Sequence, residues 1–199
     1  MKKIVIYCLV IAANCSLVEA QSYADSLQKH RENYVHELVK DGPLESVDSV
    51  LVDFYSAKEN YLVKCKFVAT KGGEPFEIPT SAGTTKTYTK FGEFRFKLNG
   101  KKQKLAVYRS MVLLNHPIYK DYLFIPFKDK TNGTETYGGG RYLDLFMKDV
   151  AGEEIILDFN KAYNPYCAFS DGYSCPIPPQ ENHLKIRVEA GEKNFRGKY

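Results

Sequence analysis

The feature that most constrains the fold is an alternation of apolar and polar side chains that begins near Tyr61 and recurs to the C-terminal region. Such alternation sends successive side chains to opposite faces of a β-strand. The segments that show it are short and lack helical stretches between them, so βαβ units are not expected. The expected strands are 61–70, 84–89, 93–98, 103–108, 122–127, 141–146, 154–159 and 184–190.

Turn residues between these segments indicate how the strands connect. Asn99-Gly100 separates two of them and is the strongest hairpin signal in the chain. Asn132-Gly133 offers a second turn. Many short strands with tight turns predict a mainly β, single-domain protein, built as an antiparallel β-barrel or β-sandwich.

One helix is expected before the strands. Tyr23, Leu27, Tyr34 and Leu38 recur at helical spacing, and Ser22 with Asp25 three residues later has the pattern of an N-terminal cap. Asp41-Gly42-Pro43 is typical of a helix end, because glycine suits the left-handed cap and proline cannot continue the helix. We therefore expect one N-terminal α-helix on a β-rich domain.

The first twenty residues have the pattern of a secretory signal peptide. Lys2 and Lys3 precede a short apolar run, and Val18-Glu19-Ala20 resembles a small-residue cleavage site. We expect a signal peptide over 1–20, a single domain over 21–199, and a periplasmic or secreted protein. Lipidation at Cys15 is an alternative, although Asn14 stands where a small residue is expected. No segment reaches the ~20 apolar residues of a transmembrane helix.

Charge gives no support to nucleic-acid binding. The formal net charge is +4, and loss of Lys2, Lys3 and Glu19 with a signal peptide would leave +3. The tight basic cluster Lys101-Lys102 with Lys104 follows the Asn99-Gly100 turn, which is typical of a solvated hairpin end.

Three cysteines remain after residue 20. Cys167 and Cys175 are eight residues apart in a proline-rich loop, and in an exported protein such a pair is expected to form a disulfide. Cys65 lies in an alternating strand and is expected to be a small core residue.

Three glycines precede the strand that begins at Arg141. A dinucleotide site would need a helix after these glycines, whereas "RYLDLF" alternates as a strand. Glycines before a strand indicate a bulge or a close backbone approach, which could serve a ligand. We therefore consider Gly139, Gly140, Arg141 and Tyr142 as ligand-binding residues, with the guanidinium available to a carboxylate or phosphate. The alternative is that Arg141 pairs with an internal acid such as Asp158 or Glu181.

A second polar group follows the strand 154–159. Asp158, Asn160 and Asn164 lead into the proline-rich loop, and with Arg141 they could converge on one polar pocket. The alternative is that they satisfy the backbone groups of a long, partly buried loop.

Several residues could be combined into a catalytic or metal site, although no sequence motif groups them. Cys167 could act as a nucleophile with His183 as base and Asp158 or Asn160 as the orienting group. Cys167, Cys175 and His183 offer three potential zinc ligands at an unusual spacing. Asp158 and Glu181 could form a carboxylate pair. The motifs of zinc proteases, serine hydrolases and phosphate-binding loops are absent from the sequence.

Three longer motifs carry a family resemblance. "TYGGGRYLDL", "DFNKAYNPYCAF" and "CPIPPQENHLKIRVEAGEK" occur in this order, after "GEPFEIPT". In these motifs the chain resembles the exported members of an uncharacterised bacterial and archaeal family, domain of unknown function sixteen eighty-four. The resemblance implies a mainly β domain and no particular activity. Some members of that family look cytoplasmic and still carry the paired cysteines. In a reducing compartment such a pair would favour metal binding or reactivity, whereas a disulfide remains the expectation for this chain.

The sequence thus predicts an exported module that binds a small polar or anionic ligand or has a structural role, with no cofactor, no metal and no identified protein partner. The alternatives are a hydrolase that uses Asp158, Glu181 or His183, and a thiol or metal site at Cys167 and Cys175.

Overall fold

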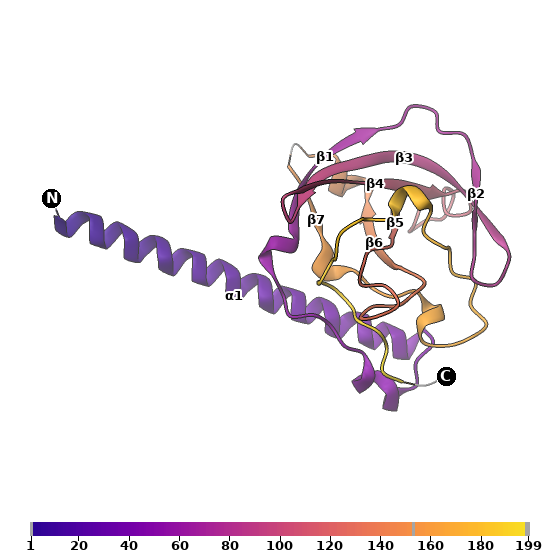
Figure 1. Cartoon of the computed structure of the whole chain (residues 1–199), viewed down its shortest axis with the longest axis horizontal. Coiled ribbons are helices and arrows are strands. Elements are labelled where there is room, and N and C mark those ends of the chain that lie inside the picture. The colour runs from indigo at the N-terminus through magenta and orange to yellow at the C-terminus, as the bar shows by residue number, and fades with distance from the viewer. Residues whose placement is uncertain (1, 153, 198–199) are drawn as a thin grey trace.

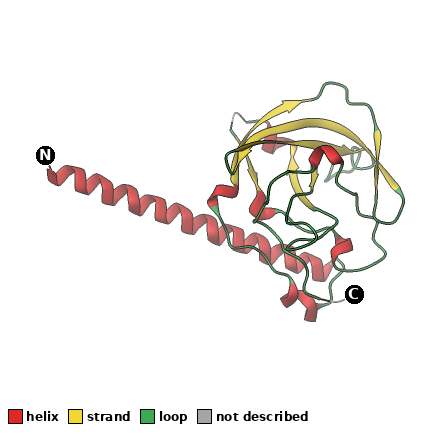
Figure 2. Cartoon of the chain, in the orientation of Figure 1, coloured by secondary structure: helices red, strands yellow, loops and turns green. Residues whose placement is uncertain are grey.

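The computed structural model of the chain describes residues 2–152 and 154–197, with residues 2–20 described by their helical backbone alone. A long helix, α1 (Lys2–Lys40), precedes a β-rich body (Figure 1). The strands are β1 (Leu62–Ala69), β2 (Phe76–Pro79), β3 (Thr85–Leu98), β4 (Lys101–Ser110), β5 (Tyr122–Phe127), β6 (Arg141–Phe146) and β7 (Ile155–Asp158). The short 3-10 segments are η1 (Ser46–Leu51), η2 (Glu59–Tyr61), η3 (Met147–Val150), η4 (Phe159–Lys161), η5 (Tyr166–Ala168) and η6 (Gln180–Asn182). Figure 2 shows that α1 is by far the longest helix of the described chain.

The strands form one antiparallel sheet in the order β6-β5-β4-β3-β1-β7, with β2 paired to β3. The sheet curls into a half-barrel whose two edges are β6 and β7. The prediction of a single, mainly β antiparallel domain with one main N-terminal helix is confirmed. The curl is neither a closed barrel nor a pair of packed sheets.

A bulge explains how the long strand β3 contributes side chains to the apolar clusters on both faces of the sheet. The register of β3 against β4 shifts between Lys90 and Gly92, and an extra residue moves all following side chains to the other face. Tyr88 therefore packs on one face, while Phe94 and Phe96 pack on the other. The same shift interrupts the alternation in the sequence, which is why two strands were predicted where there is one.

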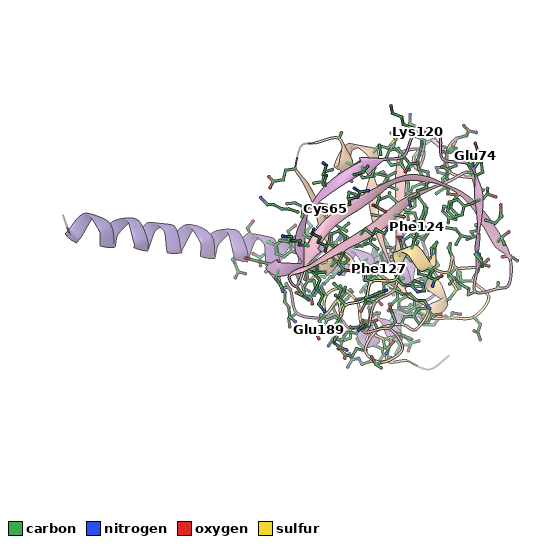
Figure 3. The ribbon with its side chains drawn as sticks, turned by 45° about the horizontal axis from the view of Figure 1, so that its top comes forward. Cys65, Glu74, Lys120, Phe124, Phe127 and Glu189 are labelled. Atoms are coloured by element: carbon green, nitrogen blue, oxygen red, sulfur yellow. A yellow bond between two sulfur atoms is a disulfide. The ribbon has the colours of Figure 1, made fainter. Side chains whose placement is uncertain are left out.

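Both faces of the sheet are therefore apolar. The larger core includes Leu105, Leu123 and Phe127, and the opposite face carries an aromatic cluster with Tyr108 and Phe124. Phe124 and Phe127 both lie within the body of the molecule in Figure 3, although they belong to different faces of β5.

The hairpin after β3 has the turn that its sequence predicts. Asn99 has φ 50° and Gly100 has φ 73°, which is the left-handed pair of a type I′ turn and matches the twist of the two flanking strands.

Residues 183–192, which we call the C-terminal strap, pack on the larger core (Figure 1). Alternate side chains of the strap are buried, as the sequence predicts: Leu184, Ile186, Val188 and Ala190. The predicted strand over 184–190 is nevertheless wrong, because most of its backbone groups pair with no neighbouring strand. Its carbonyls instead accept hydrogen bonds from other groups, above all from the guanidinium of Arg141.

The helix also differs from its prediction at one end. It does not begin at Ser22, because α1 is continuous from Lys2. The sequence on either side of Ser22 contains no glycine or proline that would interrupt a helix. The C-terminal end at Lys40 agrees with the Asp41-Gly42-Pro43 signal. The first half of α1 extends beyond the β-rich body (Figure 1).

Candidate ligand cavity

A large cavity lies where the sheet is open, between α1 and the two edge strands β6 and β7. Its volume is about 1140 Å³, slightly above the usual range of roughly 300–1,000 Å³ for small-molecule sites. Its walls come from the second half of α1, from β6 and β7, from the segment after η4 and from the proline-rich loop. Edge strands that do not pair with each other leave this gap, and α1 covers it.

Asp144 on β6 is the central polar group of this cavity. Its side chain is open to the cavity, and its Oδ1 accepts hydrogen bonds from the Tyr122 hydroxyl at 2.6 Å and from the Tyr163 hydroxyl at 2.9 Å. Oδ2 accepts a second bond from Tyr163 at 2.8 Å. Burial between the cavity walls raises the pKa of Asp144 to about 6, although both tyrosine hydrogen bonds act to lower it.

Asp144 has no ion-pair partner among the residues that the structure describes. A carboxylate that two phenols position, that faces a cavity and that no cation neutralises is an uncommon arrangement for a group of purely structural use. It is therefore the strongest candidate for contact with a ligand.

Tyrosine rings form the walls around Asp144. The rings of Tyr142 and Tyr163 meet edge to face with centroids 5.8 Å apart, and Tyr34 of α1 lies 5.7 Å from Tyr163. The hydroxyl of Tyr142 donates to the Pro176 carbonyl at 2.5 Å, and that of Tyr34 donates to Glu192 at 2.8 Å. Their hydroxyl protons thus point into the protein, while the rings line the cavity.

Asp158 and Asn160 line the other end of the same cavity. The Asp158 carboxylate accepts from the hydroxyl of Tyr23 in α1 at 3.0 Å and from the Asn160 backbone at 3.0 Å, and Lys161 lies 4.0 Å away. Asn160 is fully buried, and its amide pairs with both backbone groups of Lys58. The loop-anchoring alternative therefore describes the contacts of Asn160, and Asp158 docks the helix.

Arg141 and Asn164 do not line this cavity. The guanidinium of Arg141 is fully buried and forms an ion pair with Asp129 at 2.8 Å. It also donates to the carbonyls of Val188, Ala190 and Glu192 in the strap. Arg141 does pair with an internal acid, as the alternative proposed, but that acid is neither Asp158 nor Glu181.

Asn164 meets Glu192 in the interior. The Asn164 backbone donates to Glu192 Oε2 at 2.7 Å, and its side chain donates to the Lys193 carbonyl at 2.7 Å. Asn164 Oδ1 and Glu192 Oε1 are both buried without a hydrogen-bond partner among the described residues. Burial raises the pKa of Glu192 to about 7, while hydrogen bonds from Asn164 and Tyr34 and the charge of Arg141 act to lower it. The four polar residues predicted to converge thus form two groups.

The glycines before β6 have a structural explanation. Gly140 has φ 102°, and a Cβ on it would lie 2.8 Å from the Phe127 carbonyl oxygen and 2.6 Å from Pro178. A Cβ on Gly139 would overlap the ring of Tyr137. The close backbone approach predicted from the sequence is made by protein atoms, and neither residue lines the cavity.

The proline-rich loop is stapled at its base. A disulfide joins Cys167 and Cys175, whose Cα atoms are 6.3 Å apart, and Cys175 contributes to the cavity wall. Cys65 is a free thiol, packed against the larger core.

The remaining catalytic combinations are not assembled. His183 and Glu181 line a separate groove beside β3 and β4, whereas Asp158 and Cys175 line the main cavity. Glu181 is bound by Lys90 at 2.6 Å and by Tyr108 at 2.7 Å. Within the described part of the chain, no three His, Cys, Asp or Glu side chains are grouped to hold a metal.

Comparison with known proteins identifies the fold. Residues 50–193 match the family described as Protein of unknown function (DUF1684). The chain belongs to this family. The solution NMR structure of an uncharacterized protein from gene locus rrnAC0354 of Haloarcula marismortui is 31% identical and superimposes with a TM-score of 0.68. The similarity covers 88% of this chain and 96% of that chain. No curated protein matches the sequence.

The DUF1684 match includes Tyr122, Asp144 and Tyr163, but it begins after α1, which forms one wall of the cavity. Searched over its described residues, the chain has no helix that is both long and apolar enough to cross a bilayer.

Asp144, Tyr122 and Tyr163 were missed as site residues by sequence reasoning. The available signal was an acid between Tyr142 and Phe146, at an alternate position on a strand face that is otherwise aromatic. Such a residue needs either a partner or a cavity.

Proposed function

We propose that this DUF1684 domain binds a small polar ligand in the cavity between α1, β6 and β7. The observation that carries the proposal is the Asp144 carboxylate, which Tyr122 and Tyr163 position and which faces that cavity without an ion-pair partner among the described residues. A pocket lined by aromatic rings with a few fixed polar groups is the usual form of a small-molecule site.

The main argument for an anionic ligand no longer holds. That expectation depended on Arg141, whose guanidinium is enclosed and already bonded to Asp129 and to the strap. The proposal is therefore a ligand that donates hydrogen bonds to Asp144.

Export of the domain remains part of the proposal. A cleavage after Ala20 would leave every described contact of α1 with the body in place, beginning with the bond from Tyr23 to Asp158. A periplasmic or secreted location is also compatible with the disulfide of the proline-rich loop.

The test is the mass of the protein purified from its native compartment, measured under native conditions and again after denaturation. We expect extra mass in the native state that denaturation removes. The Asp144→Asn variant should lack it, because the amide loses the negative charge while keeping the shape of the side chain.

Glu154→Gln is the matched control. Glu154 lies at the cavity margin, is exposed and pairs with Lys64, so its loss removes the same formal charge without touching Asp144. Extra mass that persists in Asp144→Asn, or that is absent from the wild-type protein, would contradict the proposal.

A further inference from the structure

The polar floor of the cavity consists of hydrogen-bond acceptors. The hydroxyl protons of Tyr122 and Tyr163 are both donated to Asp144. Tyr163 lines the cavity, and its oxygen can therefore only accept from a ligand, as can the remaining lone pairs of the ionised carboxylate. A ligand that contacts this floor must present donors.

The charges along the cavity walls favour a cation. Five carboxylates line the cavity against three lysine and arginine side chains, which leaves two net negative charges. The carboxylates are Glu37, Asp144, Asp149, Glu154 and Asp158, and the cations are Arg31, Lys86 and Lys161. A concave surface lined by one sign of charge concentrates ligands of the opposite sign.

Two of the three cations lie near Asp158. Lys161 lies 4.0 Å from Asp158, and Arg31 stacks on Phe54 at 4.6 Å from the ring centroid and donates to the Asn160 carbonyl. Asp144 has no ion-pair partner among the described residues, so its own negative charge is uncompensated.

The walls at that end are aromatic. Tyr34, Tyr142 and Tyr163 line the cavity, and their hydroxyl protons are already donated to Glu192, to the Pro176 carbonyl and to Asp144, respectively. The faces of such rings carry negative electrostatic potential and attract ammonium groups. A neutral polyol would find acceptors here, but nothing at Asp144, Tyr122 or Tyr163 to donate to its oxygens.

We infer that the ligand of this cavity is an organic amine, whose ammonium group binds Asp144 between the rings of Tyr34, Tyr142 and Tyr163. This inference rests on the proposed binding function and names the ligand class. The cavity is larger than an ammonium group alone, so the rest of the ligand extends toward the Asp158 end, along apolar lining such as Leu143 and Ile156.

The experiment compares three probes with the same ring and different head groups, namely benzylamine, benzyl alcohol and phenylacetate. Binding to the full domain is measured by titration calorimetry at about pH 7.5, where Asp144 is ionised. We expect benzylamine to bind at least about tenfold more tightly than benzyl alcohol, and phenylacetate to bind most weakly.

Two variants test whether the preference for the amine depends on Asp144. Asp144→Asn should remove the preference for the amine, so that benzylamine and benzyl alcohol bind alike. Glu154→Gln, with the same loss of formal charge, should keep most of the preference. The comparison of the three probes on the wild-type protein decides the inference even if Asp144→Asn does not fold.

Two results would overturn the inference. Tighter binding of the alcohol or the carboxylate would reject the amine class while leaving a ligand-binding cavity. Binding of none of the three probes would also reject it, and the native mass measurement would then decide separately whether the cavity is occupied.

Discussion

At the scale of single residues, the Arg141 side chain supplies the hydrogen-bond donors that a neighbouring strand would otherwise supply to the strap. Its guanidinium accounts for the carbonyls of Val188 and Ala190, which would otherwise need the amides of a neighbouring strand. Asp129 balances its charge at 2.8 Å, and both side chains are inaccessible to solvent. A buried ion pair of this kind organises the segments around it, although its net contribution to stability can be small.

Removing one partner of this pair should be costly. We expect Arg141→Met to lower the free energy of unfolding by about 3–5 kcal/mol, because Asp129 would stay buried without its counter-charge and the strap carbonyls would lose their donor. Urea denaturation measures the change. Arg187→Met, in an exposed pair with Glu135 and Glu189, should cost less than about 1 kcal/mol. Equal effects of the two variants would show that the buried pair has no special role.

Glu192 should make stability depend on pH. Its pKa is raised to about 7 in the folded protein from an ordinary value near 4.5. Its contribution is therefore fully present below the lower value and is lost as pH rises through about 7. Between about pH 4.5 and 7 the loss should approach about 1.4 kcal/mol per pH unit, and it should level off above pH 7, where Glu192 is ionised in both states. Urea denaturation between about pH 4.5 and 8.5 measures it.

Glu192→Gln is the control for this effect. It should flatten the pH dependence between about pH 4.5 and 7, because the amide cannot ionise but can still accept from Tyr34 and Asn164. The pKa of Asp144 is also raised, from 3.8 to about 6, so Asp144→Asn should change the curve below about pH 6 and leave the slope between pH 6 and 7 to Glu192. An unchanged slope in Glu192→Gln would assign the dependence to another group.

The site could be predicted from the sequence only in part. Asp158 and Asn160, which follow a strand and enter a long loop, do line the cavity, and their role in ligand binding stays a prediction. Asp144 was not predicted as a site residue, because its partners Tyr122 and Tyr163 lie about 20 residues away on either side in the sequence. No local sequence pattern indicates that these three side chains are in contact. The strap that encloses Arg141 is more remote still, about 50 residues further along the chain.

At the scale of elements, alternation was a good guide wherever strands pair regularly. The predicted bounds of β5 and β6 agree with the structure, and Asn99-Gly100 forms the expected turn. The failures have two physical causes. The bulge in β3 interrupts the two-residue alternation of apolar side chains. The strap keeps this alternation although most of its backbone groups pair with no strand, because the alternation reflects which side chains are buried and not which backbone groups are hydrogen-bonded. The short edge strand β2, with Pro79 at its end, gave too weak a pattern.

The disulfide should stabilise the proline-rich loop. We expect the Cys167→Ser, Cys175→Ser double variant to lose about 2–3 kcal/mol, the amount that closing a loop of this length removes from the unfolded chain. In the wild-type protein neither cysteine should react with an alkylating agent before reductant is added. Labelling of both without reductant would restore the thiol hypothesis.

At the scale of the whole molecule, α1 belongs to the domain from about Tyr23 onward. Tyr23 and Tyr34 bond the body through Asp158 and Glu192, and Leu27 and Leu38 are buried. These contacts all lie beyond the proposed cleavage site at Ala20.

We therefore expect the exported protein to begin at Gln21 and to keep this packing. Intact mass of the protein from the exported fraction measures its first residue. Ala20→Phe should block processing, because the cleavage site requires a small side chain. A protein that begins at Cys15 with added lipid mass would support the anchored alternative, and an uncleaved wild-type chain would contradict export by this route.

The position of the strap also constrains how the protein is made. The carbonyls that accept hydrogen bonds from the buried Arg141 guanidinium lie about 50 residues further along the chain. A nascent polypeptide that stops short of Glu192 leaves the Arg141 guanidinium with fewer partners and the larger core without its cover. We therefore expect the domain to complete its folding only after Glu192 has been synthesised.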